Sequence, residues 1–191
     1  MQITFIRHSK TKVDPAISPT RWELSRDGIR LAQELGSREV IKGLSIIYSS
    51  LQTKALETAF YLSKPNNIEV RTDDRLTEVT SFTNKFIADE DTYSRNVKDY
   101  YSGRIARISG GETIQEALAR FNGAIQDIAA VNGAEKRIGI VSHGNILALF
   151  SAQFDATIDC YQLHKEIKQP DIAIFDGHTK RFISFFGSMN T

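Results

Sequence analysis

Hydrophobic and polar positions along this chain change repeatedly between two periods, and the changes predict strands that alternate with helices. Short apolar runs typical of strands lie at 2–6, 44–48, 68–71, 137–142, 171–175 and 181–186. Gly177 and His178 separate the last two runs, which predicts a terminal hairpin. Strands alternating with helices favour a largely parallel sheet that is covered on both faces.

Apolar residues at three- and four-residue spacing predict the helices between these strands. Ser25 is typical of an N-cap for a helix that continues to about residue 35, and Ser49-Ser50 of the start of another that continues to about residue 62. A capping box, Thr113 with Glu116, precedes a long apolar stripe. A further helix is expected over about 144–154.

Residues 79–110 break this alternation, because they are polar and irregular but contain several aromatic and basic side chains. The segment is too short and too poor in aliphatic residues to hold a core of its own, so we expect a helical excursion from a single domain over 1–191. Its aromatic and basic residues fit two roles, namely contact with a ligand and packing of an amphipathic helix over a crevice. A mixture of the two is favoured, with no individual contact identified.

Composition restricts the class of function. The chain has 191 residues, a net charge of +1 and 41% apolar residues, which fit a globular protein and give no broad basic face for nucleic acid. Cys160 is the single cysteine, and the four histidines are scattered, so disulfide and metal sites have little support. No apolar run reaches the length of a membrane span, and the first strand leaves no room for a signal peptide. We therefore expect a cytoplasmic protein without a membrane partner.

Candidate chemistry lies where two of the strands end. Arg7 and His8 directly follow the first strand, and His143 and Gly144 directly follow the fourth. Because the carboxyl ends of parallel strands share one edge of a sheet, these residues are expected to meet in one crevice. An arginine fork matches phosphate oxygens, a histidine can act as a nucleophile, and a helix start favours an anion. The pattern indicates chemistry on a phosphoryl group.

Two further segments add charged groups to this edge of the sheet. Lys54 lies near the start of the helix after the second strand and supplies a positive charge. Glu78 follows the third strand and supplies a carboxyl group, although Asp73 and Asp74 stand close to it in the sequence. These residues together predict a phosphate pocket with an acid nearby.

Five short blocks of the chain resemble, in order, those of the histidine phosphatase superfamily, which has the phosphoglycerate-mutase-like fold. The blocks are Arg7-His8-Ser9 with Thr11, residues 49–59 with Lys54, Leu76-Thr77-Glu78, Gly111-Glu112-Thr113 and Ser142-His143-Gly144. Each block alone is a weak signal, but all five in this order span almost the whole chain. The resemblance implies a three-layer α/β/α sandwich with a mostly parallel central sheet, helices on both faces and the helical excursion near 79–110.

The same resemblance implies a phosphatase that hydrolyses a small phosphomonoester without a metal or other cofactor. His8 would attack phosphorus and form a phosphohistidine, while Glu78 would protonate the leaving oxygen and then accept a proton from water. His143 completes the implied catalytic set. The implied phosphate-binding residues are Arg7, Lys54, Thr11, Ser9 and Gly144.

Lys54 departs from the family pattern, since most members have an arginine there and lysine lacks the bidentate fork. The short chain and the residues after His8, Ser9 and Lys10, favour a phosphatase over a phosphoglycerate-type mutase. A non-catalytic protein that binds a phosphorylated ligand is the main alternative. The sequence identifies neither the substrate nor the oligomeric state.

Four other residues invite a functional interpretation. Glu112 fits equally a partner of the site and a favourable charge at a helix start. His164 and His178 lie in polar or turn contexts, which indicates structural or solvated side chains. Cys160 has no base close to it in the sequence, which favours a packing role over a nucleophilic one.

Overall fold

A mixed sheet runs through the middle of the molecule, and its central strands are parallel. The computed structural model describes residues 1–83, 86–133 and 136–188. In this part of the chain the strands are β1 (Gln2–Arg7), β2 (Ile46–Ser49), β3 (Glu69–Thr72), β4 (Arg137–Ser142), β5 (Asp171–Asp176) and β6 (Arg181–Ser184). Their order in the sheet is β3-β2-β4-β1-β5-β6. The first four are parallel, whereas β5 is antiparallel to β1 and forms a hairpin with β6.

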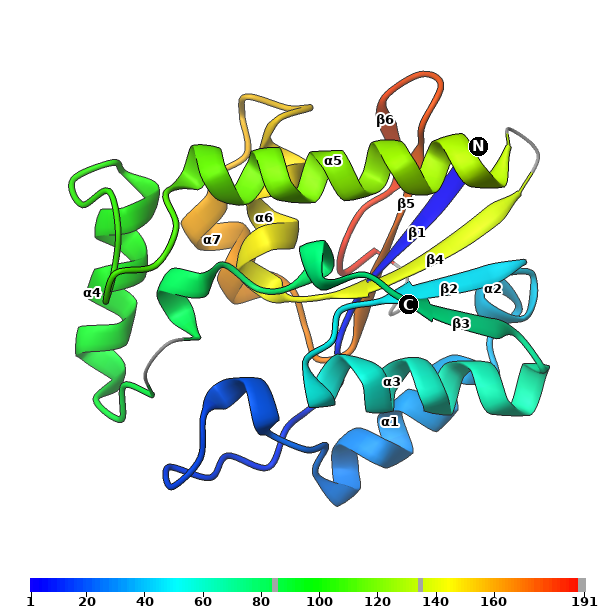
Figure 1. Cartoon of the computed structure of the whole chain (residues 1–191), viewed down its shortest axis with the longest axis horizontal. Coiled ribbons are helices and arrows are strands. Elements are labelled where there is room, and N and C mark those ends of the chain that lie inside the picture. Colours follow the sequence, from blue (N-terminus) through cyan, green and yellow to red (C-terminus); the bar gives the residue numbers. More distant parts are fainter. Residues whose placement is uncertain (84–85, 134–135, 189–191) are drawn as a thin grey trace.

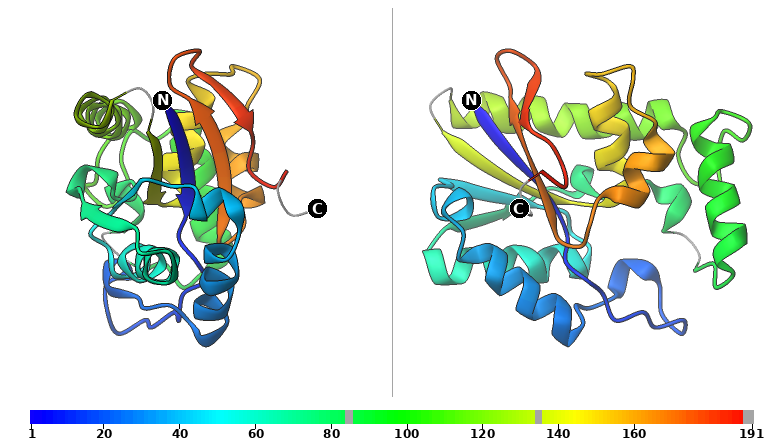
Figure 2. Two further views of the ribbon diagram at one scale, coloured as in Figure 1. Left: turned by 90° about the vertical axis from the view of Figure 1, so that its right-hand side faces the viewer. Right: turned by 180° about the vertical axis from the view of Figure 1, so that it is seen from behind.

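Helices cover both faces of this sheet (Figure 1). One face carries α1 (Arg26–Gly36), the short α2 (Glu39–Lys42) and α3 (Thr53–Ser63), and the other carries α5 (Ile114–Asn132), α6 (Gly144–Ala152) and α7 (Cys160–Glu166). The turned views in Figure 2 show the same three layers. The predicted three-layer fold with a mostly parallel central sheet is therefore confirmed.

Alternate side chains of the central strands enter two separate cores. Phe5 and Ile140 pack beneath α5 and α6, whereas Ile6 and Val141 pack beneath α1 and α3. All four side chains are fully buried. This near-complete burial explains why the central strands appear in the sequence as continuous apolar runs.

Side-chain caps fix the helix starts that position the loops. The Ser25 hydroxyl accepts a hydrogen bond from the Gly28 amide at the start of α1. Thr113 and Glu116 form the predicted capping box of α5. The helix expected from Ser49-Ser50 begins later, at Thr53, because these two serines lie in the turn that leaves β2.

The segment 79–110 forms a 3-10 turn (Thr80–Phe82) and the helix α4 (Glu90–Tyr101) at one end of the molecule (Figure 1). Val97 and Tyr100 are buried and belong to the same core as α5 and α6. The excursion thus shares the main core instead of forming its own. No helix in the described ranges is both long and apolar enough to cross a bilayer.

Candidate active site

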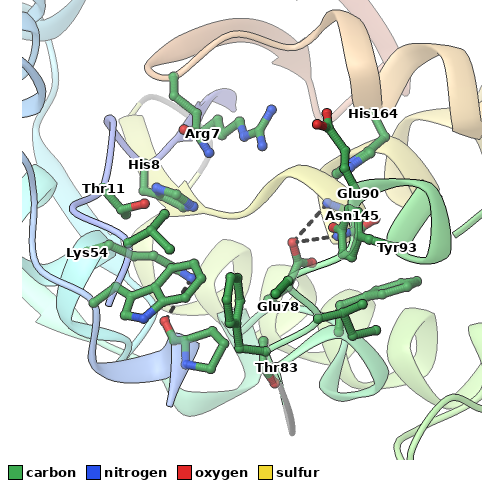
Figure 3. Close-up of a pocket in the computed structure, with 18 residues that line it drawn as sticks. Arg7, His8, Thr11, Lys54, Glu78, Thr83, Glu90, Tyr93, Asn145 and His164 are labelled. Atoms are coloured by element: carbon green, nitrogen blue, oxygen red, sulfur yellow. Dashed lines mark hydrogen bonds between the residues drawn. The ribbon is translucent and has the colours of Figure 1, made fainter. Parts of the chain in front are cut away.

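A pocket of about 460 Å³ opens beyond the carboxyl ends of the parallel strands. Figure 3 shows His8, Thr11 and Lys54 on one side of it, and Glu78 and Asn145 on the other. Its full lining is Arg7, His8, Thr11, Val13, Pro19, Trp22, Lys54, Glu78, Phe82, Thr83, Phe86, Ile87, Ala88, Glu90, Tyr93, Asn145, His164 and Gln169. The sequence-predicted residues Arg7, His8, Thr11, Lys54 and Glu78 are therefore brought together around one space.

His8 is held as a neutral imidazole, and its Nε2 has no hydrogen-bond partner among the residues that the structure describes. Its backbone amide donates to the Ser142 carbonyl at 2.9 Å, which fixes the residue where β1 ends beside β4. The ring Nδ1 lies 2.8 Å from the Ser9 carbonyl oxygen. Since a carbonyl only accepts, Nδ1 carries the proton and the lone pair lies on Nε2. Burial, followed by the charges of Lys54 and Arg7, lowers the pKa of His8 well below its usual range.

Arg7 and Gly144 meet at the upper edge of the pocket. The Arg7 guanidinium donates through Nη1 to the Ile167 carbonyl, and its buried Nε has no partner within the described residues. A side chain at position 144 would place a Cβ only 2.8 Å from Arg7 Cζ. Gly144 therefore leaves room for the guanidinium, and it does not itself line the pocket.

Lys54 is an almost fully buried cation, with 6% of its surface exposed. Its Nζ donates to the Pro19 carbonyl at 3.1 Å and lies 5.7 Å from the centre of the Trp22 ring. Burial lowers the pKa of Lys54 to about 8, while the charge of Glu78 opposes that shift and the charge of Arg7 adds to it. Lys54 is therefore not a solvated surface lysine.

His143 lies next to His8, with 5.1 Å between the two ring centres, but it is fully buried and does not line the pocket. Its Nε2 lies 2.8 Å from the Ser50 hydroxyl oxygen, and its buried Nδ1 has no partner within the described residues. Burial and the neighbouring His8, Lys54 and Arg7 lower the pKa of His143 well below its usual range. The ring is therefore neutral in the unliganded protein and offers a hydrogen bond, not a positive charge.

Glu78 faces the pocket with both carboxylate oxygens engaged. Oε2 accepts from the backbone amide and the side-chain amide of Asn145, each at 3.0 Å. Oε1 accepts at 2.9 Å from the amides of Val79 and Ile146. Two of these donors are backbone amides in the first turn of α6, where the helix dipole favours a negative group. Asp73 instead pairs with Arg75, which leaves Glu78 as the carboxyl group of this segment that enters the pocket.

Glu112 supports the chain on both sides of Glu78. Its Oε1 accepts from the Thr80 amide at 3.0 Å, and the same carboxylate pairs with Arg120 of α5. Arg120 in turn donates to the backbone carbonyls of Arg75 and Thr77. Of the two interpretations of Glu112, the structure favours a partner that holds the active-site segment in place.

Ser9 and Thr11, the two hydroxyl residues after His8, lie in different environments. Thr11 lines the pocket, as predicted. Ser9 does not: it is fully buried, and its hydroxyl donates to the Gly28 carbonyl at 2.7 Å. Its amide donates to the Thr58 hydroxyl, so Ser9 ties the His8 loop to α1 and α3. The Ser9 hydroxyl is thus engaged within the fold, and Ser9 does not line the pocket.

Several pocket residues were not identified from the sequence. His164, interpreted as structural or solvated, lines the pocket from α7, and its buried Nδ1 has no partner in the described part of the chain. Trp22, Phe86 and Tyr93 also line it, whereas Tyr100 packs in the core. The mixture expected for 79–110 is thus found, but the identity of each contact depends on tertiary placement. Asn145 could have been identified from the sequence, because it directly follows the Ser142-His143-Gly144 block.

Cys160 and His178 have no place in this pocket. The Cys160 thiol packs in α7 with its sulfur 3.9 Å from the Ala148 carbonyl, and burial raises its pKa. His178 lies in the turn between β5 and β6. Among the described residues, no three His, Cys, Asp or Glu side chains are grouped as metal ligands would be.

Comparison with known proteins identifies the family. The model of histidine phosphatase superfamily branch 1 matches residues 3–171, which is most of the chain. The chain belongs to the histidine phosphatase superfamily. The family predicted from the sequence is confirmed. No curated protein matches the sequence significantly.

Three solved structures, from bacteria and a eukaryote, have a fold similar to that of this chain. A phosphoserine phosphatase from Entamoeba histolytica, determined in complex with 3-phosphoglyceric acid, has a TM-score of 0.77 and 24% identity over 99% of this chain and 98% of that one. YhfR of Bacillus stearothermophilus has a TM-score of 0.76 and 23% identity over 97% and 96%. A mycobacterial glucosyl-3-phosphoglycerate phosphatase has a TM-score of 0.72 and 20% identity over 96% and 97%.

Proposed function

We propose that this histidine phosphatase hydrolyses a small phosphomonoester through a phosphohistidine on His8, without a metal ion. The observation that carries the proposal is the state of the His8 ring, whose Nδ1 is fixed by the Ser9 carbonyl while Nε2 is left free. A neutral imidazole held in this orientation is ready to attack phosphorus. The substrate would be soluble and the protein cytoplasmic, with neither nucleic acid nor membrane as a partner.

The charges around the pocket support the transfer step. As His8 Nε2 bonds to phosphorus, the bond from phosphorus to the leaving oxygen breaks, and negative charge develops on the phosphoryl oxygens. Arg7 and Lys54, which line the pocket with His8, would stabilise that charge, and His143, whose ring lies next to that of His8, would donate a hydrogen bond. These groups supply in part the electrostatic stabilisation that metal ions supply in many other phosphoryl-transfer enzymes.

Glu78 is the proposed acid and base. It would give a proton to the leaving oxygen in the first step and take one from the attacking water in the second. The water then attacks phosphorus, the bond between His8 and phosphorus breaks, and inorganic phosphate is released. The backbone amides of Asn145 and Ile146 fix the direction of the Glu78 carboxylate toward the pocket. Neither residue is among those proposed to bind the phosphate.

The test is hydrolysis of 4-nitrophenyl phosphate with chelator present, comparing the wild type with His8→Ala. We expect turnover in the wild type and its loss in His8→Ala, with a ³²P label from the substrate retained on the wild type alone after denaturation in alkali, in which a phosphohistidine is stable. His178→Ala is the matched control, because it removes an imidazole from a turn outside the pocket. Full turnover in His8→Ala would overturn the proposal.

Two other outcomes would replace it. Phosphate binding at micromolar concentration with no turnover on any phosphomonoester would make the chain a phospholigand-binding protein. Transfer of the label to a second acceptor in preference to water would make it a mutase.

A further inference from the structure

The pocket has two chemically different halves. The inner half, next to His8, is polar and holds both cations of the described lining, Arg7 and Lys54. The outer half is apolar and aromatic. It is lined by Val13, Trp22, Phe82, Phe86, Ile87, Ala88 and Tyr93. A phosphomonoester bound with its phosphate at His8 would therefore place its leaving group among apolar side chains.

Two aromatic rings from distant segments form the wall of the outer half. Trp22 comes from the loop after β1, and Phe86 from the excursion that follows β3. Their ring centres are 5.3 Å apart and their planes meet at 73°, an edge-to-face pair. The Trp22 indole is fixed in turn, because its Nε1 donates to the Asp14 carbonyl at 2.9 Å. The wall is thus a defined surface that planar apolar groups can contact.

The charges of the outer half disfavour an anion. Glu90, in the first turn of α4, places an exposed carboxylate at the pocket, and Figure 3 shows it on the same side as His164. His164 adds no positive charge, since burial lowers its pKa to about 3. No residue of the outer half that the structure describes is a lysine or an arginine. A carboxylate on the leaving group would meet the Glu90 carboxylate, while Arg7 and Lys54, the cations of the described lining, would be engaged by the phosphate.

We infer that the outer half selects phosphomonoesters whose leaving group is apolar, planar and free of negative charge, and that Trp22, Phe86 and Glu90 set this specificity. The inference rests on the proposed function, since it requires that the phosphate binds at His8. The inferred substrate differs in charge from 3-phosphoglyceric acid, the acidic ligand with which the phosphoserine phosphatase of similar fold was determined.

The first experiment compares phenyl phosphate with 4-carboxyphenyl phosphate, which differ by one carboxylate. The carboxylate makes the phenol a slightly better leaving group, so intrinsic reactivity works against the expected order. We expect kcat/KM to be about five- to tenfold higher for phenyl phosphate, the effect of one like charge at short range in a partly solvated site. Glu90→Gln should reduce this ratio toward one, and Asp91→Asn, the next acid of the same helix turn, should leave it unchanged.

The second experiment tests the aromatic wall with 1-naphthyl phosphate and phenyl phosphate. We expect the wild type to favour the naphthyl ester, and Trp22→Leu and Phe86→Leu each to reduce the naphthyl-to-phenyl ratio of kcat/KM by roughly three- to tenfold. Phe60→Leu is the control, because it removes an exposed ring from α3, outside the pocket. A ratio measured on one preparation does not depend on its folded fraction, so a destabilised variant still gives a clear answer.

The outcomes distinguish the two proposals. Turnover that requires His8 but is equally fast on the carboxylated ester, or an unchanged naphthyl preference in both leucine variants, would overturn the inference and leave the proposed function standing. No turnover on any of the three esters would overturn the proposed function and the inference with it.

Discussion

Lys54 shows how burial gives a single side chain a pH-dependent role. Its ammonium group is almost fully buried, and that burial lowers its pKa to about 8 from the usual 10.5. The side chain is therefore charged below pH 8 and loses its charge as the pH rises through that value. Because kcat/KM reports the ionisation of the free enzyme, we expect it to fall by up to about tenfold per pH unit on the alkaline side.

The measurement is a pH profile of kcat/KM on 4-nitrophenyl phosphate, whose leaving group needs no proton from Glu78, with Lys54→Arg beside the wild type. An arginine keeps its charge throughout, so its profile should stay flat between about pH 7 and 10. The phosphate group itself titrates near pH 6 and adds nothing to the alkaline limb. The same alkaline fall in both proteins would show that another group is responsible.

Individual side chains also differ in how far the sequence predicts their place. Arg7, His8, Thr11, Lys54 and Glu78 were identified because each lies at a strand end or helix start, which chain position alone reveals. Ser9 has the same position but turns into the fold, because the Gly28 carbonyl is within reach of its hydroxyl. That difference depends on the packing of α1 and is not visible in the chain.

At the scale of elements, the start of α6 organises the site. Its first amides hold Glu78, and its first residue, Gly144, leaves space for the Arg7 guanidinium. We expect Gly144→Ala to displace Arg7 and to lower kcat/KM about ten- to hundredfold, in line with the loss of charge-assisted hydrogen bonds to phosphate. The protein should remain folded, because the atom that must move is the end of a flexible side chain.

Gly123→Ala is the matched control for that substitution. Gly123 lies inside α5, where an added Cβ would meet only Arg75 Nη1, at 3.9 Å. Alanine there should stabilise the protein by about 0.5–1 kcal/mol and raise Tm by about 1–4 °C with unchanged activity. Equal losses of activity in both variants would mean that Gly144→Ala acts through general damage to the fold.

Elements with strong periodicity were the ones the sequence revealed. The six strand regions and the α5 capping box were located because their patterns extend over enough residues to be distinct. The short helices α2 and α7 were missed, since four and seven residues give too few turns for a pattern to emerge. The consequence for function is direct, because α7 carries His164 into the pocket.

At the scale of the whole molecule, the site joins parts that are far apart in the chain. His8 follows the first strand, Glu78 lies between β3 and the excursion, and Asn145 lies in the first turn of α6. Two cores, on opposite faces of one sheet, support these positions. Because β1 and β4 contribute side chains to both cores, we expect the two to unfold together as a single domain.

Thermal unfolding tests this expectation. Far-UV circular dichroism reports all the helices, whereas fluorescence of the single tryptophan, Trp22, reports the wall of the pocket. We expect both signals to give one transition with the same Tm. Inorganic phosphate at 100 times its Kd stabilises the folded state by about 2.7 kcal/mol, which should raise both values by roughly 5–10 °C. If phosphate moved only the tryptophan signal, the pocket wall would be a separate unfolding unit, and the single cooperative domain would be wrong.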